Sequence, residues 1–185
     1  MRRIVVGVSG ASGIPIAIRV LEGLKATPDV YTCLVMTKGA EMTLESESDM
    51  SLEEFTALAD ETFDLDNIGA SIASGTYKTE GMIVVPCSMK TLAGIHSGFS
   101  ENLLLRAADV TLKERRKLVL VARETPLSAI HLRNMAELSQ DGAIILPPMM
   151  TYYQQPKTID DMTKHIAGKI LDIFDIDMND FNRWQ

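Results

Sequence analysis

Three short motifs in this chain combine small, hydroxyl-bearing and charged residues in ways that suit ligand binding. In Ser9-Gly10-Ala11-Ser12-Gly13, the glycines permit a tight turn and a close approach of the backbone to a ligand. In Pro86-Cys87-Ser88-Met89-Lys90-Thr91, Ser88 can cap a helix whose first turn then holds Lys90. In Arg123-Glu124, a guanidinium suited to phosphate stands beside a carboxylate able to move a proton. These residue types predict a site for a polar or anionic ligand.

Each motif also has a plainer interpretation. The glycine loop departs from the G-x-G-x-x-G fingerprint, so it suits a nucleotide-type ligand and a tight structural turn equally well. Ser88 can be a simple cap, and Arg123 and Glu124 can form a structural ion pair. Lys169, on the last expected helix, can be a solvated surface lysine. Cys87 has no histidine at a recognisable spacing, which disfavours a nucleophilic role.

The elements that must position these motifs are short apolar strands alternating with amphipathic helices. The apolar runs 4–8, 34–36, 82–85, 118–121 and 143–146 are typical of parallel strands covered on both faces. Helices are expected over 14–27, 101–115, 127–139 and 158–174, and over the acidic stretch 41–66. The alternation predicts an α/β fold, a single Rossmann-like (flavodoxin-like) doubly wound domain with a mainly parallel sheet. All three motifs then fall at the carboxyl ends of strands, where such sheets bind ligands.

Composition narrows the function classes. The chain has 185 residues, enough for one domain over 1–185, and a formal net charge of −7, which argues against nucleic-acid binding. Two cysteines and three scattered histidines form no metal-binding pattern. No signal segment or membrane-length apolar run is present, so we expect a cytoplasmic protein. The tail at about 175–185 contains the only tryptophan, Trp184, and is expected to dock onto the domain.

Several motifs together resemble the UbiX-type flavin prenyltransferase family. The similar segments are Gly10-Ala11-Ser12-Gly13, 86–95, 106–110, 112–116, 118–127 and 130–135. They match in order and spacing, and the similarity extends from the first strand to about Lys169. Segment 82–95 especially resembles members that are paired with hydroxyaryl-acid decarboxylases and were formerly named as components of those enzymes.

The resemblance implies an activity, a cofactor and partners. It implies metal-independent transfer of a dimethylallyl group from dimethylallyl monophosphate to reduced flavin mononucleotide (FMN). The prenylated FMN would be the cofactor of a separate UbiD-type aromatic-acid decarboxylase. Members commonly form homo-oligomers, often dodecamers with sites between subunits. Two alternatives stay open: an FMN-binding carrier or assembly subunit of a hydroxyaryl-acid decarboxylase, and a flavin-dependent decarboxylase.

The resemblance also implies roles for individual residues. The residues expected to hold FMN are Gly10, Ala11, Ser12, Thr37, Ser88, Met89, Lys90, Thr91 and Arg123. Those expected around the prenyl phosphate are Ala73, Ser74, Gly75, Lys113, Arg123, Glu124, Tyr153, Lys169 and Trp184, with Lys113 supplied by a neighbouring subunit. Ser12, Glu47, Glu124 and Tyr153 are assigned to the reaction, and either Glu124 or the released phosphate takes the ring proton. Lys169 stands where the family usually has arginine, which puts the choice between a mono- and a diphosphate donor in question.

Overall fold

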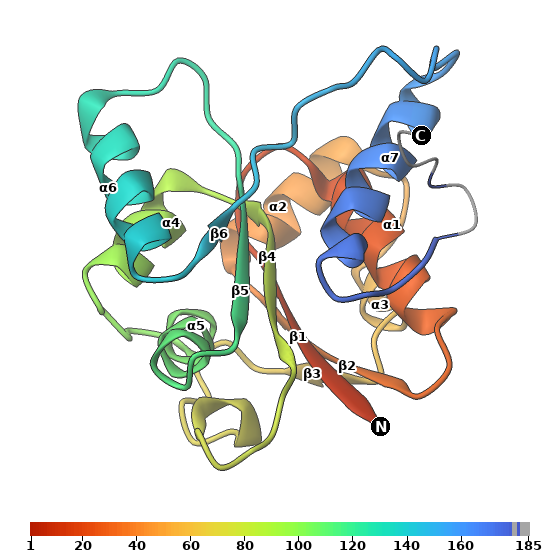
Figure 1. The fold of residues 1–185 in the computed structure, drawn as a ribbon. Helices are drawn as coiled ribbons and strands as arrows, with labels where there is room; N and C mark the ends of the chain where they lie inside the picture. Colours follow the sequence, from red (N-terminus) through yellow and green to blue (C-terminus); the bar gives the residue numbers. More distant parts are fainter. Residues whose placement is uncertain (179–180, 182–185) are drawn as a thin grey trace.

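A six-stranded sheet forms the centre of the molecule in the computed structural model, which describes residues 1–178 and 181 (Figure 1). Its strands are β1 (Arg2–Val8), β2 (Val30–Met36), β3 (Glu61–Phe63), β4 (Gly81–Cys87), β5 (Lys117–Ala122) and β6 (Ile144–Ile145). Each neighbouring pair is parallel, and the spatial order is β3-β2-β1-β4-β5-β6. The order reverses between β1 and β4, so the loops that leave these two strands diverge and open a crevice. The predicted doubly wound α/β fold with a parallel sheet is confirmed.

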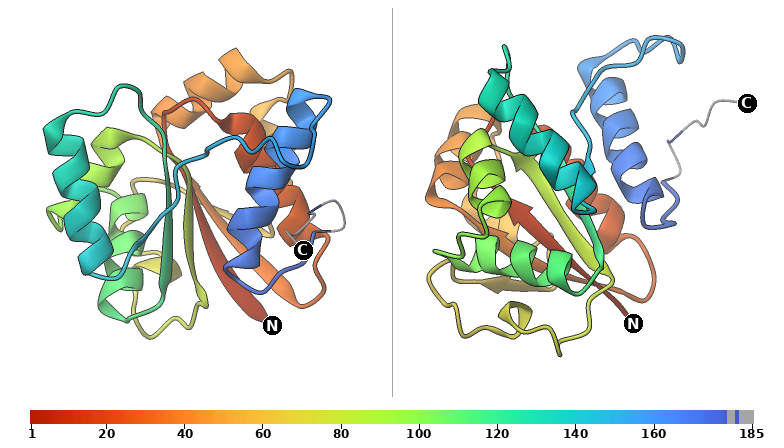
Figure 2. Two further views of the ribbon diagram at one scale, coloured as in Figure 1. Left: turned by 45° about the horizontal axis from the view of Figure 1, so that its top comes forward. Right: turned by 60° about the vertical axis from the view of Figure 1, so that its left-hand side comes forward.

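Helices cover both faces of this sheet (Figure 2). The helical elements are α1 (Ile14–Lys25), α2 (Lys38–Glu47), α3 (Leu52–Thr56), the 3-10 turn η1 (Ser71–Ala73), α4 (Met89–His96), α5 (Leu103–Lys113), α6 (Ala129–Gln140) and α7 (Ile159–Asp172). Apolar residues of α1, α2, α3 and α7 pack on one face, and those of η1, α4, α5 and α6 pack on the other.

The strands are apolar on both sides because each side meets a helical layer. In β1, Ile4 and Val6 face the layer of α1 and α7, whereas Val5 faces the layer of α4 and α5. All three side chains are at most 2% exposed. Burying a side chain of this kind contributes about 1.5–3 kcal/mol, so a continuous apolar run is what a doubly covered strand requires.

The acidic stretch 41–66 differs in part from the expectation of a helix. Helices α2 and α3 occupy its first half, but Glu61–Phe63 forms the edge strand β3, paired with Cys33–Val35 of β2. The pairing arises because β2 offers an open edge on the side away from β1. Three residues without alternation carry no sequence signal for a strand, so the prediction of a helix there was wrong.

The C-terminal segment packs against the domain as far as it is described. Ile176 is 2% exposed, and the ring of Phe181 lies 5.2 Å from the ring of His165 on α7, centroid to centroid. Trp184 lies outside the described residues, so docking of the whole tail at 175–185 stays a prediction. Among the described helices, none combines the length and the apolar character needed to span a membrane.

Candidate ligand site at the carboxyl edge of the sheet

Ser9 ties the two loops of the crevice together. Its hydroxyl donates to the Pro86 carbonyl at 2.9 Å and accepts from the Ser88 N–H at 2.8 Å, and the side chain is fully buried. The loop after β1 and the loop after β4 therefore keep a fixed spacing. Sequence analysis included Ser9 in the glycine-loop motif but gave it no role of its own. Its bridge to Ser88 spans 79 residues, and no local pattern indicates such a contact.

Gly10 lies where the loop after β1 touches the beginning of α2. A Cβ atom added to Gly10 would come within 2.9 Å of the Gly39 Cα and carbonyl carbon, and backbone atoms cannot move aside as a flexible side chain can. Gly10 is therefore required by close packing of two backbone segments. Thr37, one of the expected flavin ligands, caps α2 by accepting from the Ala40 N–H at 3.2 Å.

Ser88 caps α4, as the sequence predicts. Its hydroxyl accepts from the Thr91 N–H at 3.3 Å and donates to the Thr91 hydroxyl at 3.1 Å. The helix begins at Met89, so Lys90 lies exposed in its first turn. This turn contains no acidic residue, and the partial positive charge of the helix N-terminus adds to that of Lys90.

A pocket of about 720 Å³ lies where these segments meet, a size within the range of small-ligand sites. Five expected flavin-binding residues line it: Gly10, Thr37, Ser88, Lys90 and Thr91. Its apolar lining comes from Leu65, Ala93, Phe99, Leu104 and Leu105. The lining also contains two lysines, Lys38 and Lys90, and two carboxylates, Asp66 and Glu101. Apolar walls combined with hydroxyls and charged groups fit an aromatic heterocycle with polar edges, which is the chemistry of FMN.

Glu47, at the end of α2, closes the glycine loop from the other side. Its Oε2 accepts from the N–H groups of Gly13 at 2.9 Å and Ile14 at 3.0 Å. Partial burial raises the pKa of Glu47, but hydrogen bonds from Ser12, Gly13 and Ile14 and the charge of Arg123 outweigh this, so its pKa is lowered. The carboxylate is therefore a fixed anion beside Ser12.

This contact corrects one expectation. The glycine loop was expected to form part of a site for a polar or anionic ligand, but the N–H groups of Gly13 and Ile14 already donate to Glu47. The glycine loop thus binds a carboxylate of its own chain, that of Glu47, which lies 34 residues after Gly13 and 33 residues after Ile14.

Arg123 and Glu124 follow β5 at the same edge. The Arg123 N–H donates to the Cys87 carbonyl at 3.1 Å, which joins the ends of β5 and β4. The Glu124 carboxylate accepts from the Thr125 N–H at 2.9 Å. The side chains of Arg123 and Glu124 are both exposed. No ion pair joins Arg123 to Glu124 in the described part of the chain, so the structural ion-pair interpretation is not supported.

Tyr153 and Lys169 belong to the segment after β6 and to α7. The Tyr153 hydroxyl lies 3.4 Å from Nε2 of His165, a residue that sequence analysis did not assign. His165 shares the buried face of α7 with apolar residues, so its position carried no signal of its own. Lys169, one turn further along α7, is exposed and lies 3.6 Å from Asp172 on the same helix.

A second group of expected residues lies elsewhere, beside the C-terminal end of α5. Lys113 forms an ion pair with Glu114 at 2.6 Å, and a Cβ added to Gly75 would lie 3.0 Å from the Lys113 Nζ. Ala73 and Ser74 precede Gly75 in the same loop. Ala73, Ser74, Gly75 and Lys113 therefore form one cluster, which we call the α5 cluster.

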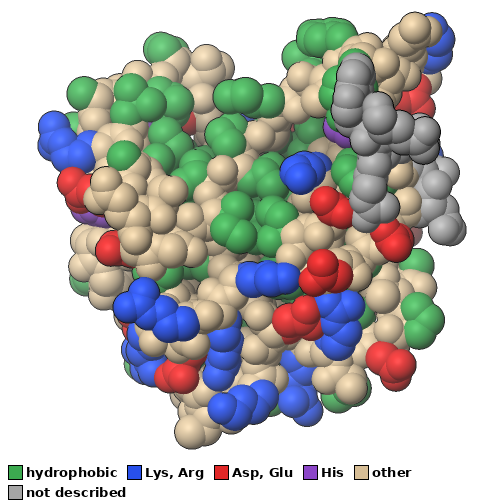
Figure 3. Space-filling view, viewed as in Figure 1, with side chains coloured by type: hydrophobic (Ala, Val, Ile, Leu, Met, Phe, Trp, Pro, Cys, Tyr) green, Lys and Arg blue, Asp and Glu red, His purple; other side chains and the backbone are tan. Residues whose placement is uncertain are grey.

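The α5 cluster does not meet the carboxyl edge within one chain. Lys113 precedes β5 and Arg123 follows it, and a strand of six residues is about 20 Å long. Figure 3 shows Lys and Arg side chains gathered along the lower edge of the molecule, which is the amino-terminal edge of the sheet. The structure thus groups the expected phosphate-binding residues at two opposite edges.

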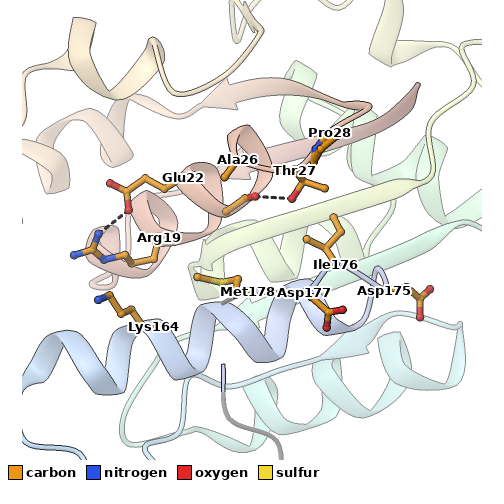
Figure 4. A pocket seen from close by; sticks show the side chains of 11 residues that line it. Arg19, Glu22, Ala26, Thr27, Pro28, Lys164, Asp175, Ile176, Asp177 and Met178 are labelled. Carbon is orange, nitrogen blue, oxygen red and sulfur yellow. Dashed lines mark hydrogen bonds and ion pairs between the residues drawn. The ribbon is translucent and has the colours of Figure 1, made fainter. Parts of the chain in front are cut away.

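Another hollow of about 640 Å³ lies between α1 and the segment after α7 (Figure 4). Arg19 on its rim pairs with Glu22 at 2.7 Å and with Asp160 of α7 at 2.6 Å. Lys164 also pairs with Asp160, at 3.1 Å. None of the expected site residues lines this hollow, and its ion pairs hold α1 against α7.

Comparison with known proteins decides the family. The family model described as Flavoprotein matches residues 1–176. The flavin prenyltransferase LpdB of Lactiplantibacillus plantarum is 52% identical over 185 residues, which cover 100% of this chain and 99% of LpdB. The chain belongs to the UbiX-like flavin prenyltransferase family. The resemblance inferred from the motifs is thereby confirmed.

Solved structures agree with membership of the prenyltransferase family. The dodecameric FMN-dependent UbiX-like decarboxylase from Escherichia coli O157:H7 superposes with a TM-score of 0.97 at 48% identity, covering 99% of both chains. AnUbiX (PadA1), solved in complex with FMN and dimethylallyl pyrophosphate, also gives a TM-score of 0.97, at 51% identity. That match covers 100% of this chain and 97% of AnUbiX.

Proposed function

We propose that this chain transfers a dimethylallyl group from dimethylallyl monophosphate to reduced FMN. The observation that carries the proposal is the pocket at the carboxyl ends of β1, β2 and β4, where five residues expected from the family motifs meet. AnUbiX, a relative that is 51% identical, was solved in complex with FMN and dimethylallyl pyrophosphate. The product, prenylated FMN, would serve a UbiD-type aromatic-acid decarboxylase.

In this proposal the flavin lies over the glycine loop and the N-terminus of α4. Gly10 and Ala11 allow close approach, Thr37, Ser88 and Thr91 offer hydroxyls, and Met89 and Lys90 complete the contact with Arg123. Reduced FMN, when bound, supplies the nucleophilic ring nitrogen and the neighbouring aromatic carbon that accept the prenyl group. The chain's task is to orient these atoms and to exclude water.

The prenyl phosphate would be held by cations and by the Tyr153 hydroxyl. Ionisation of an allylic phosphate needs preorganised charge on the leaving group, which Arg123 after β5 and Lys169 on α7 would supply. The α5 cluster of a neighbouring subunit would add Lys113, Ala73, Ser74 and Gly75. This arrangement requires a homo-oligomer, and the E. coli relative is a dodecamer.

Two carboxylates and one aromatic ring complete the proposed chemistry. Glu124, exposed at the end of β5, or the released phosphate accepts the ring proton. Glu47 fixes Ser12 beside the reaction centre through its hydrogen bonds to the glycine loop. Trp184, outside the described residues, would cover the pocket.

Two other functions compete with this proposal. The E. coli relative is named an FMN-dependent decarboxylase, and a carrier that binds FMN without changing it would need the same pocket. Glu124 and Tyr153 favour the transferase, because a carrier needs neither a proton acceptor nor a grip on a phosphate ester. A direct decarboxylase would act on an aromatic acid without any prenyl donor.

The test is anaerobic incubation with reduced FMN and dimethylallyl monophosphate, followed by mass spectrometry of the extracted flavin. We expect a mass gain of one C5H8 unit that is absent without donor. The extracted product should also activate a UbiD-type decarboxylase purified without cofactor. Unmodified flavin with both the mono- and the diphosphate, despite measured FMN binding, would favour the carrier. Release of CO₂ from an aromatic acid without donor would favour the decarboxylase.

A further inference from the structure

His165 is a buried histidine on α7 that lies directly behind Tyr153. Its side chain is 8% exposed, and Nε2 is 3.4 Å from the Tyr153 hydroxyl. The two rings meet edge to face, with centroids 5.8 Å apart and an interplanar angle of 89°. The ring of Phe181 packs against the same imidazole, with the ring centroids 5.2 Å apart. Gly168 leaves the space for the Phe181 ring, because a Cβ atom there would meet it. The imidazole is therefore held between two aromatic rings.

The protonation of this imidazole follows from its surroundings. Burial lowers the pKa of His165, and the positive charge of Lys169 lowers it further, so the ring is neutral at neutral pH and carries one N–H. Nδ1 has no hydrogen-bond partner within the described chain. A buried N–H without an acceptor is less tolerable than an unpaired ring lone pair, which places the proton on Nε2, facing the Tyr153 oxygen.

We propose that His165 is a positioning residue that acts through Tyr153, by donating its Nε2–H to the phenol oxygen. A hydroxyl that accepts from His165 keeps its own proton for a different acceptor. In the proposed function, on which this inference rests, that acceptor is an oxygen of the prenyl phosphate. Without His165, the hydroxyl proton would rotate among several directions, and the grip on the ester would weaken.

The test compares two substitutions of His165 in the full-length protein. His165→Phe keeps an aromatic ring without a donor, and His165→Gln keeps an N–H of similar reach without the ring. We expect His165→Phe to raise KM for dimethylallyl monophosphate about three- to tenfold, the effect of one lost hydrogen bond, with FMN affinity and melting temperature retained. We expect His165→Gln to restore most of the wild-type KM. If His165→Phe does not fold, His165→Leu removes the donor in a smaller side chain.

A double substitution separates action through Tyr153 from an independent effect. Tyr153→Phe should raise KM by itself, and adding His165→Phe should then change nothing further, because the hydroxyl it orients is gone. A wild-type KM in His165→Phe, or effects that multiply in the double variant, would overturn the inference. Wild-type enzyme in the same assay is the reference. Failure of wild type to form prenylated FMN would overturn the proposed function, and this inference with it.

Discussion

Two carboxylates near the carboxyl edge differ in ways that assign them different tasks. Glu47 is fixed by hydrogen bonds from Ser12, Gly13 and Ile14, and its pKa is lowered. Glu124 is exposed and accepts from the adjacent Thr125 N–H. A carboxylate held by three donors is a poor proton acceptor, whereas an exposed one can approach a substrate. At the residue scale, Glu124 therefore suits proton transfer and Glu47 suits positioning.

Glu124→Gln should bind FMN as wild type does but form prenylated FMN about 100-fold more slowly, because the amide cannot accept a proton. The measurements are an FMN titration and a product assay by mass spectrometry. Glu45→Gln, an exposed carboxylate on α2, is the control and should leave both unchanged. Wild-type turnover in Glu124→Gln would mean that the released phosphate, and not Glu124, accepts the ring proton.

Lys169→Arg should bind dimethylallyl monophosphate equally well or up to about tenfold more tightly, because guanidinium can contact two phosphate oxygens. The Lys169 side chain is exposed, so the larger group has room. KM for the mono- and the diphosphate measures the effect, with Lys164→Arg on the same helix as the control. A large loss of affinity would mean that the lysine does something its charge alone does not explain.

At the scale of elements, the site depends on how the ends of β1 and β4 are joined. Ser9→Ala removes the hydroxyl that accepts from the Ser88 N–H and leaves that part-buried group without its partner. We expect a loss of about 1–3 kcal/mol in the free energy of unfolding and weaker FMN binding. Ser46→Ala removes an exposed hydroxyl on α2 and should cost much less. Equal stability of the two variants would contradict the bridging role of Ser9.

The contact between α2 and α1 should depend on pH. The pKa of Glu47 is lowered in the folded state, so its contribution to stability is present above the ordinary glutamate pKa. That contribution is lost as pH falls through the lower folded pKa. The stability difference between wild type and Glu47→Gln, measured by denaturant unfolding from pH 7 to pH 3, should therefore shrink toward the acid end. A difference that stays constant would exclude the carboxylate as its cause.

At the scale of the whole molecule, two features are consistent with the proposed contacts between subunits. The α5 cluster and the carboxyl edge lie at opposite ends of β5. Large apolar side chains are also exposed on α6 and the segment after β6: Ile130, Leu132, Met149, Met150 and Tyr152. Figure 3 shows hydrophobic side chains gathered over this upper part of the molecule. An apolar surface of this kind is typical of subunit contacts, which would also bring Lys113 to a neighbour's site.

Mixing two inactive variants tests whether sites are shared. Lys113→Ala and Glu124→Gln, co-expressed, should regain activity at about a quarter of the sites if each site combines residues of two subunits at random. Arg123→Ala with Glu124→Gln is the matched control, because both residues lie at the same edge of one chain, and no activity should return. Light scattering should show a homo-oligomer in every case. No recovery in the first mixture would place Lys113 outside the site.

Much of the fold could be predicted because it depends on local patterns. The runs in β1, β2, β4 and β5 are apolar on both faces. Ser88 and Thr158 are the N-cap residues of α4 and α7, and such residues indicate where a helix begins. β3 was missed because an edge strand of three residues is held by its partner β2 and has no pattern of its own. The pocket residues were found because they follow strand ends, where a parallel sheet binds ligands.

By itself the sequence determined five of the six strands, the helix caps, the edge that carries the pocket and, through its motifs, the family. Only the tertiary structure decided that Glu47 occupies the glycine loop, that Ser9 bridges to Ser88 and that His165 lies behind Tyr153. It also decided that Lys113 and Arg123 lie at opposite edges. The reason is physical: caps and periodicity act within a few residues, whereas Ser9 and Ser88 are 79 residues apart. Contacts between residues so far apart in the sequence depend on the order of the strands in the sheet.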